Sequence, residues 1–158
     1  MSQAGTPLVV PPSGGVVYRP EGSRLIAGAG DTGGALGLLA LGPMPPGRWV
    51  PGHTHRDAAE AWYVLEGELT FRFGDRTEIA PAGSFVFVPP GVVHEFGNAG
   101  NAPARFLEFF VPGGSEGFHL ERAALEQAKL SGPDGQYTNL DAETLAALAR
   151  KYGIDFVE

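Results

Sequence analysis

The sequence predicts an all-β fold of the sandwich or barrel type, built as one domain. Three observations lead to this prediction. The chain has 158 residues, which suits a single ordinary domain. Its 24 glycines and 14 prolines are spread along the chain, and between residues 24 and 112 they interrupt it roughly every 8 to 12 residues. Between the breaks apolar residues alternate with polar ones, as at Leu69, Phe71 and Phe73.

Composition and charge exclude several classes of protein. A hydrophobic fraction of 43% with 18% charged residues describes a globular chain and not a disordered one. The longest apolar stretch, from Ala35 to Leu41, is far shorter than the roughly 20 residues of a membrane-spanning helix. The net charge is −7 and the basic residues form no cluster, so nucleic acid is not an expected partner.

Two further absences bear on location and chemistry. Residues 1–10 contain neither the basic segment nor the apolar core of a secretory signal, so a cytoplasmic location is expected. The chain contains no cysteine, and therefore no disulfide, thiolate nucleophile or thiolate metal ligand. Any metal must be held by histidine and oxygen ligands.

Within this single domain we expect three parts: an N-terminal arm over residues 1–23, a barrel over 24–112 and a helical tail over 113–158 that packs on the barrel. The arm is rich in proline and glycine, and its short apolar pieces at 8–10 and 16–18 predict that it becomes ordered by packing against another surface. In the barrel, the runs 85–88 and 106–110 are apolar at nearly every position, which predicts central strands.

The tail carries helical spacing in two segments, 119–130 and 141–152. Either Asn139 or Asp141 could cap the second helix. His119 has no partner at a spacing that suits a shared ligand, so we expect it to lie on the surface and not in a site.

The other three histidines and one acid are arranged as metal ligands. His53 and His55 are two residues apart and face the same side of an extended strand. Glu60 follows after a turn-prone stretch, and His94 follows a tight turn that could bring its strand alongside. Three imidazoles and a carboxylate suit one divalent Mn, Fe, Co, Ni, Cu or Zn ion and are a poor set for calcium. The alternative is four polar residues in a barrel without metal.

Alternation along the strands sorts some of the aromatic residues. If Glu60 points into the barrel, Trp62 shares its face, and Phe96 likewise shares the face of His94. Trp62 and Phe96 are therefore the predicted walls of a substrate pocket. The pattern leaves the facing of four other aromatics open: Phe85, Phe87, Phe106 and Phe110.

The ligand residues lie within two longer motifs. The first consists of Gly47, His53, His55, Glu60 and Gly67, and the second of Gly83, Pro89, Gly91, His94 and Asn98. In spacing and residue type these ten positions resemble the two motifs of the cupin superfamily, so the chain looks like a single-domain cupin over about residues 35–112. The resemblance implies a double-stranded β-helix, or jelly-roll, barrel with a metal inside one end, held by His53, His55, Glu60 and His94.

Short segments of the tail are similar to small cupins grouped with the quercetin 2,3-dioxygenases: Pro112-Gly113-Gly114, Gly117-Phe118 and Tyr152-Gly153-Ile154. This resemblance implies a metal-dependent oxygenase that acts on an aromatic or enolic small molecule. Glu60 would then take the proton of the enol as general base, and Phe118 would partly cover the mouth of the barrel and line the pocket.

Two other functions remain open at this point. One is a non-catalytic module that binds a metal or small ligand, and the other is a non-redox isomerase or lyase. An isomerase of phosphorylated sugars would need basic residues in its pocket, and the strands offer only Arg72, Arg76 and Arg105. The cupin resemblance also implies a homodimer that exchanges its N-terminal arms. The alternative is an arm folded on its own barrel.

Overall fold

The fold is that of a computed structural model, which describes residues 6–130 and 140–157. Its strands are β1 (Val16–Val17), β2 (Arg24–Ala27), β3 (Gly37–Met44), β4 (Trp49–His55), β5 (Ala59–Glu66), β6 (Glu68–Phe73), β7 (Arg76–Pro81), β8 (Phe85–Val88), β9 (His94–Gly97), β10 (Ala104–Val111) and β11 (Ile154–Phe156). Its helices are α1 (Ala29–Thr32), α2 (Glu116–Leu130) and α3 (Ala142–Lys151).

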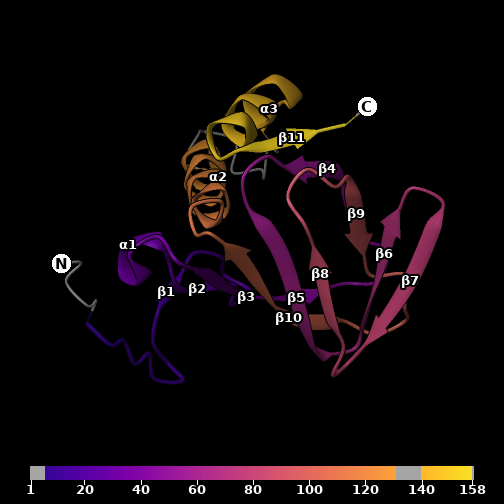
Figure 1. The fold of residues 1–158 in the computed structure, drawn as a ribbon, viewed down its shortest axis with the longest axis horizontal. Coiled ribbons are helices and arrows are strands. Elements are labelled where there is room, and N and C mark those ends of the chain that lie inside the picture. Colours follow the sequence, from indigo (N-terminus) through magenta and orange to yellow (C-terminus); the bar gives the residue numbers. More distant parts are fainter. Residues whose placement is uncertain (1–5, 131–139, 158) are drawn as a thin grey trace.

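Two antiparallel sheets form the barrel (Figure 1). One sheet has six strands in the order β1-β2-β3-β10-β5-β8, and the other has five in the order β11-β4-β9-β6-β7. Neighbours along the chain therefore often lie in different sheets, as β4 and β5 do, which is the double-sheet arrangement of a jelly roll. The predicted all-β barrel with a helical tail is confirmed.

The core lies between the sheets and follows the alternation of side chains along each strand. On β5, Trp62 and Val64 are fully buried, whereas Tyr63 and Leu65 are exposed on the outer face. Inward-facing residues of six other strands complete the principal cluster: Met44, Leu69, Phe71, Ala80, Val88, Phe96, Ala104 and Phe106. An aromatic core of this kind fills the lumen of a small barrel at one end.

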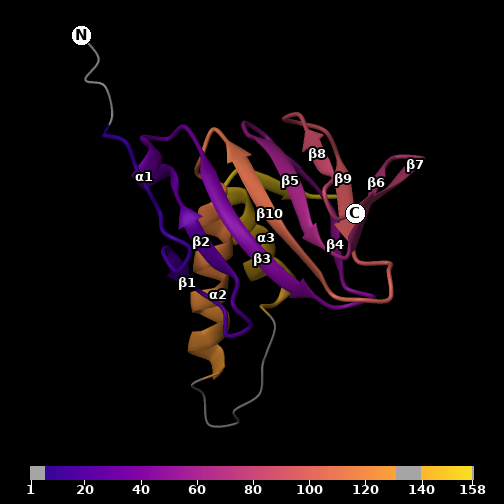
Figure 2. The same ribbon diagram turned by 90° about the horizontal axis from the view of Figure 1, so that it is seen from below.

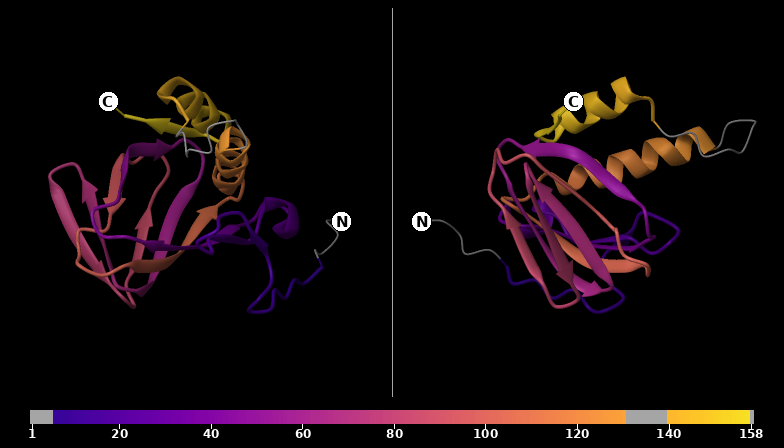
Figure 3. Two further views of the ribbon diagram at one scale, coloured as in Figure 1. Left: turned by 180° about the vertical axis from the view of Figure 1, so that it is seen from behind. Right: turned by 90° about the vertical axis from the view of Figure 1, so that its right-hand side faces the viewer.

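The tail returns to the barrel and adds a strand to it. Strand β11 pairs antiparallel with β4, so that Ile154 lies opposite His55 and Phe156 opposite His53. Figures 2 and 3 show α2 and α3 on the same side of the barrel as β11. The sequence predicted the two helices within a few residues but not this strand, because three residues are too few to show a periodic pattern.

The helix caps explain the observed ends of the tail helices. Asp141 caps α3, and its side chain accepts a hydrogen bond from the backbone N–H of Thr144 at 2.8 Å. The other predicted cap, Asn139, lies outside the described residues. Helix α2 begins three residues before the predicted start, at Glu116, whose buried carboxylate accepts backbone hydrogen bonds from Ala29 and Gly114.

The described part of the predicted arm runs along the edge of the six-stranded sheet, where β1 pairs with β2. Both residues of β1, Val16 and Val17, are exposed. None of the helices in the described ranges has the length and apolar character needed to span a membrane.

Gly67 and Gly74 provide a matched test of how the sheets are joined. Both have positive φ, 70° and 59°, which costs an alanine about 1–2 kcal/mol. A Cβ on Gly67 would also lie 2.6 Å from the carbonyl oxygen of Pro103, whereas one on Gly74 would meet nothing within 4 Å. We expect Gly67→Ala to lower the free energy of unfolding by at least about 1 kcal/mol more than Gly74→Ala, measured by urea denaturation. Equal losses would contradict the close approach.

Candidate metal centre and its cavity

The four predicted ligands converge from both sheets. His53 and His55 lie on β4 and His94 lies on β9, directly opposite His53, while Glu60 reaches in from β5 of the other sheet. The Nε2 atoms of His53, His55 and His94 lie 3.6, 2.8 and 2.9 Å from Oε2 of Glu60. All four side chains are buried, and one ligand atom of each lies within 4.8 Å of the others.

Hydrogen bonds on the far side of the rings fix which nitrogen faces the cluster. Nδ1 of His53 lies 2.9 Å from the carbonyl oxygen of Pro51, and Nδ1 of His94 lies 3.0 Å from that of Val92. A carbonyl oxygen only accepts, so both Nδ1 atoms carry the proton when the rings are neutral. The lone pair is then on Nε2, which faces the centre, and this is the usual arrangement of a metal-binding histidine.

Without an ion, neighbouring groups shift the pKa values of Glu60 and His53. Burial would raise the pKa of the Glu60 carboxyl, but its close contacts with His53, His55 and His94 hold that pKa well below its usual range. Burial would lower the pKa of His53, but its interactions with Glu60 and with the carbonyl of Pro51 raise it above the ordinary value. The Glu60 carboxylate therefore stays ionised beside the His53 ring.

One atom of the cluster has no hydrogen bond. Nε2 of His55 is buried and has no hydrogen-bond partner among the described residues, although Oε2 of Glu60 is only 2.8 Å away. Three imidazole nitrogens and a carboxylate form the nitrogen and oxygen donor set of a divalent transition ion. His53, His55, Glu60 and His94 therefore form a buried cluster that suits a metal ion.

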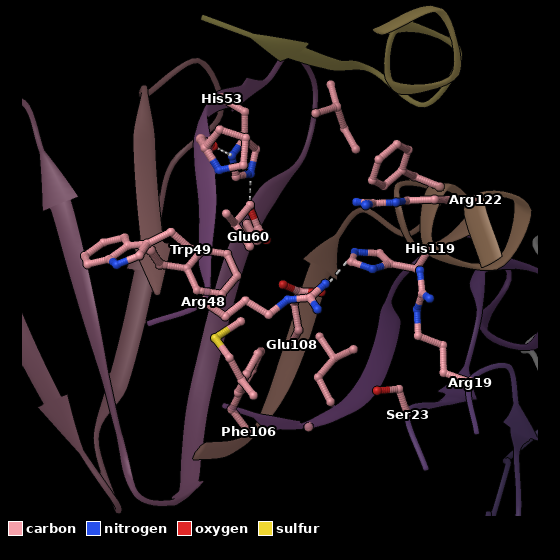
Figure 4. A pocket seen from close by; sticks show the side chains of 18 of the residues that line it. Arg19, Ser23, Arg48, Trp49, His53, Glu60, Phe106, Glu108, His119 and Arg122 are labelled. Carbon is pink, nitrogen blue, oxygen red and sulfur yellow. Dashed lines mark hydrogen bonds and ion pairs between the residues drawn. The ribbon is translucent and has the colours of Figure 1, made fainter. Parts of the chain in front are cut away.

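The cluster forms part of the wall of a cavity of about 250 Å³ (Figure 4). His53, His55 and Glu60 contribute to this wall. Apolar side chains supply much of the rest: Leu41, Met44, Val50, Phe96, Phe106, Phe110, Phe118, Leu145, Ile154 and Phe156. Because several of these come from the tail, the tail completes the cavity as well as the sheet.

Two of the three aromatic residues predicted to line the pocket do line the cavity. Phe96 and Phe118 line the cavity, whereas Trp62 does not. Trp62 faces the barrel interior but is fully buried against the rings of Phe71 and Phe96. Strand parity gives the face of a residue and not its depth, so it could not separate a pocket wall from the core beneath it.

Glu108 and His119 line the cavity although the sequence did not place them there. Glu108 lies on β10 and is 1% exposed, and its Oε1 accepts a hydrogen bond of 3.1 Å from the indole N–H of Trp62. Nε2 of His119 lies 3.2 Å from Oε2 (Figure 4). The expected surface position of His119 is thus corrected: its side chain is 27% exposed and packs against Phe110 and Phe118.

The surroundings shift the pKa of Glu108 and of nearby Tyr18. Burial raises the pKa of the Glu108 carboxyl, and the charge of His119 offsets this only in part. Burial and the charge of Glu108 raise the pKa of the Tyr18 hydroxyl, which stays protonated. An acidic residue within the apolar run 106–110, on the parity of two phenylalanines, is the one sequence signal that could have indicated Glu108.

The arginines of the cavity also differ from those considered from the sequence. Arg72, Arg76 and Arg105 pair on the outside with Glu95, Glu78 and Glu66. Three others line the cavity: Arg19, Arg48 and Arg122. Glu126 pairs with Arg19 and Arg122 at 2.6 and 2.8 Å. Arg19, Arg48 and Arg122 come from the arm, a loop and α2. None of these segments has a strand pattern from which an inward direction could be predicted.

The fold and the site together define a class of protein: a jelly-roll barrel with a buried cluster of three histidines and one glutamate, suited to a metal ion, inside one end. Residues 41–111 match the family model described as "Cupin domain". Together with the observed double-stranded β-helix fold, this match shows that residues 41–111 form a cupin domain.

Similar proteins cover the same region. A segment is 40% identical over 73 residues to "Putative germin-like protein 9-2" of Oryza sativa subsp. japonica, covering 42% of this chain and 34% of that protein. Another is 30% identical over 91 residues to "Tetracenomycin polyketide synthase protein TcmJ" of Streptomyces glaucescens, covering 57% and 61%. The aligned segments thus span between a third and two thirds of these relatives.

A solved structure shares both fold and some sequence. It is described as a predicted oxalate decarboxylase from Thermotoga maritima, and it is 26% identical with a TM-score of 0.50. The match covers 57% of this chain and 78% of that one.

The pKa shifts predict opposite pH dependence for the metal-free and metal-loaded protein. The raised pKa of His53 contributes stability that is present below about pH 6.5 and lost as pH rises through the folded-state value. A bound ion needs neutral imidazoles, so its contribution grows with pH. As the pH rises from about 6 to about 8.5, we expect the contribution of this cluster to Tm to fall in the chelator-treated protein and to grow in the reloaded protein.

The His53→Gln variant is the control, because it removes the titrating ring. It should lose most of the pH dependence of both forms in the same thermal melts. Parallel curves for the chelator-treated and reloaded wild-type protein would contradict the assignment of the cluster as a metal site.

Proposed function

We propose that this cupin is a metal-dependent oxygenase of the dioxygenase type. Its substrate would be an aromatic or enolic small molecule that binds at the His53, His55, Glu60 and His94 site. The observation that carries this proposal is that a transition-metal ligand set forms part of the wall of an aromatic-lined cavity. A ligand in that cavity would meet the site directly, as a substrate must.

The protein groups assign the roles around the reacting oxygen. A bound redox-active ion would supply Lewis acidity toward an enol oxygen and a path for electrons between the substrate and dioxygen. Glu60 is ionised and reaches into the centre of the cluster, so it can accept the proton of the enol as general base. Phe96, Phe110 and Phe118 exclude water and pack against the substrate rings.

The proposed reaction balances without a further reductant. Both atoms of dioxygen enter the substrate, and the substrate itself supplies the electrons that reduce them. The enol O–H proton passes to Glu60 and returns to the product. The only co-reactant is dioxygen.

The relative from Streptomyces glaucescens supports the substrate class. That relative is named as a polyketide synthase protein, and polyketides carry phenols and enolisable carbonyls. Compounds of that kind offer adjacent oxygens to a metal and flat rings to an aromatic cavity.

A second candidate is a non-redox lyase that acts on a small carboxylate. Arg19, Arg48 and Arg122 line the cavity, and guanidinium groups recognise carboxylates. The structural relative described as a predicted oxalate decarboxylase supports the same idea. A purely non-catalytic binding module would use the cavity and metal without turnover.

Replacement of Glu60 tests the proposed role of the carboxylate. In protein loaded separately with Fe, Mn, Ni, Co and Cu, oxygen uptake is measured across flavonols, enols and catechols. We expect uptake with at least one pair of metal and substrate, and a loss of about 10²-fold or more in kcat for Glu60→Gln.

Glu66→Gln is the matched control, since Glu66 ends the same strand but is exposed. It should keep the wild-type rate. Full activity in Glu60→Gln would exclude Glu60 as the base. Absence of uptake with every metal would favour the lyase or the binding module, and carbon dioxide release from small carboxylates would then separate these two.

We also propose that the chain forms a homodimer through its N-terminal arm. The support is that β1 ends the six-stranded sheet and that Leu8, Val9, Val16 and Val17 are exposed apolar residues on this arm. A second chain would cover both the unpaired strand edge and these side chains.

Charged substitutions test the arm as the dimer contact. The double change Val16→Glu and Val17→Glu should give monomers by light scattering, because it buries charge in the proposed interface. Ile79→Glu, at an exposed position on β7, should leave the dimer intact. A monomeric wild-type protein at micromolar concentration would contradict the proposal.

A further inference from the structure

The cavity contains a second group of polar atoms, which lies beside the metal ligands because Glu108 interacts directly with Glu60. Glu108 from β10, His119 from α2 and Tyr18 from the segment after β1 all line it. None of the three belongs to the metal cluster. They come from the barrel, the tail and the arm, so they meet only in the folded chain.

Two buried atoms in this group have no hydrogen bond. Among the residues that the structure describes, Oε2 of Glu108 and the hydroxyl oxygen of Tyr18 have no hydrogen-bond partner, although Nε2 of His119 lies 3.2 Å from Oε2. Leaving such a group unpaired in the interior is unfavourable, so a partner is expected for each. Glu108 is 1% exposed, and it projects toward His119 in the interior of the cavity (Figure 4).

Packing fixes the direction of Glu108. The indole N–H of Trp62 donates to Oε1, and Trp62 is itself fully buried among aromatic rings. Oε1 is therefore committed to the core, and Oε2 is the oxygen left for a ligand. The ring of His119 is held between Phe110 and Phe118, so it too has limited freedom to move away.

We propose that Tyr18, Glu108 and His119 form a subsite that binds a second hydroxyl group of the substrate, separate from the oxygen at the metal. A hydroxyl donates one hydrogen bond and accepts two, so it can donate to Glu108 and accept from Tyr18 or His119. It can also pair with either protonation state of Glu108. A ligand carboxylate would lack the donor and would place its charge beside this acid.

This inference rests on the proposed function and narrows its substrate class. The preferred substrate is an aromatic or enolic compound with at least two hydroxyl groups, one for the metal and one for this subsite. Two oxygens of the ligand are then fixed, which positions the bond that reacts. A compound with only the metal-binding enol would bind but would lack the hydrogen bonds of this subsite.

A matched set of ligands and variants tests the subsite by binding alone. The probes are 3-hydroxyflavone, which carries only the metal-binding enol and ketone, and its derivatives with one added hydroxyl at ring positions 5, 7 or 4′. Affinity for the zinc-loaded protein is measured anaerobically by calorimetry, so that no turnover is needed. At least one derivative should bind about tenfold more tightly than 3-hydroxyflavone, the gain of a hydrogen bond to a charged or buried partner.

Tyr18→Phe should reduce that gain to about twofold or less, because it removes one hydroxyl and keeps the ring. Tyr63→Phe is the control, since Tyr63 is exposed on the outer face of β5, and it should keep the full gain. Glu108→Gln should also reduce the gain, but it changes a buried acid, so Tyr18→Phe is the decisive variant if Glu108→Gln does not fold.

The outcomes separate the two levels of the proposal. If 3-hydroxyflavone and all derivatives fail to bind, both the aromatic substrate and the subsite are overturned. If 3-hydroxyflavone binds but no derivative gains affinity, or the gain survives in Tyr18→Phe, only the subsite is overturned. If only the subsite is overturned, water and not a substrate hydroxyl is the partner of the Tyr18 hydroxyl and of Oε2 of Glu108.

Discussion

The structure depends on one buried carboxylate. Glu60 reaches from the six-stranded sheet into a group of three imidazoles on the five-stranded sheet, and all four side chains are excluded from solvent. An ionised acid in this position is tolerated only if it is paired or bound to a cation. The two sheets must therefore hold β4, β5 and β9 in a fixed relation, because a slip of one residue would turn the ligands out of the barrel.

The tail supports this same constraint. Strand β11 pairs with the ligand-bearing end of β4, opposite His53 and His55. Ser115, at the start of the tail, lies 3.4 Å from Nδ1 of His55 and donates a hydrogen bond to the carbonyl of Tyr152. Because Phe118, Leu145 and Ile154 also line the cavity, the tail that pairs with the ligand-bearing strand also encloses the cavity.

The polar groups of the cavity lie next to one another. The metal cluster presents imidazole and carboxylate groups, and Glu108, which interacts with Glu60, adds further donors and acceptors together with Tyr18 and His119. Aromatic residues line other parts of the cavity. Such an arrangement selects for ligands that combine flat, apolar rings with more than one oxygen, as a polyhydroxylated aromatic compound does.

The sequence by itself determined the barrel, the two-helix tail and the ligand set, because strand alternation, turn residues and the spacing of His53, His55, Glu60 and His94 are local patterns. It also gave the inward faces of Trp62 and Phe96. The tertiary structure alone decided that Phe106 and Phe110 face inward and Phe85 and Phe87 outward, since each run is apolar on both faces. Only the tertiary structure shows that Trp62 lies behind the cavity wall and that Tyr18, Glu108 and His119 line the same cavity. The physical reason is that periodicity fixes the direction of a side chain within its own strand or helix, whereas depth and neighbours depend on how separate elements pack.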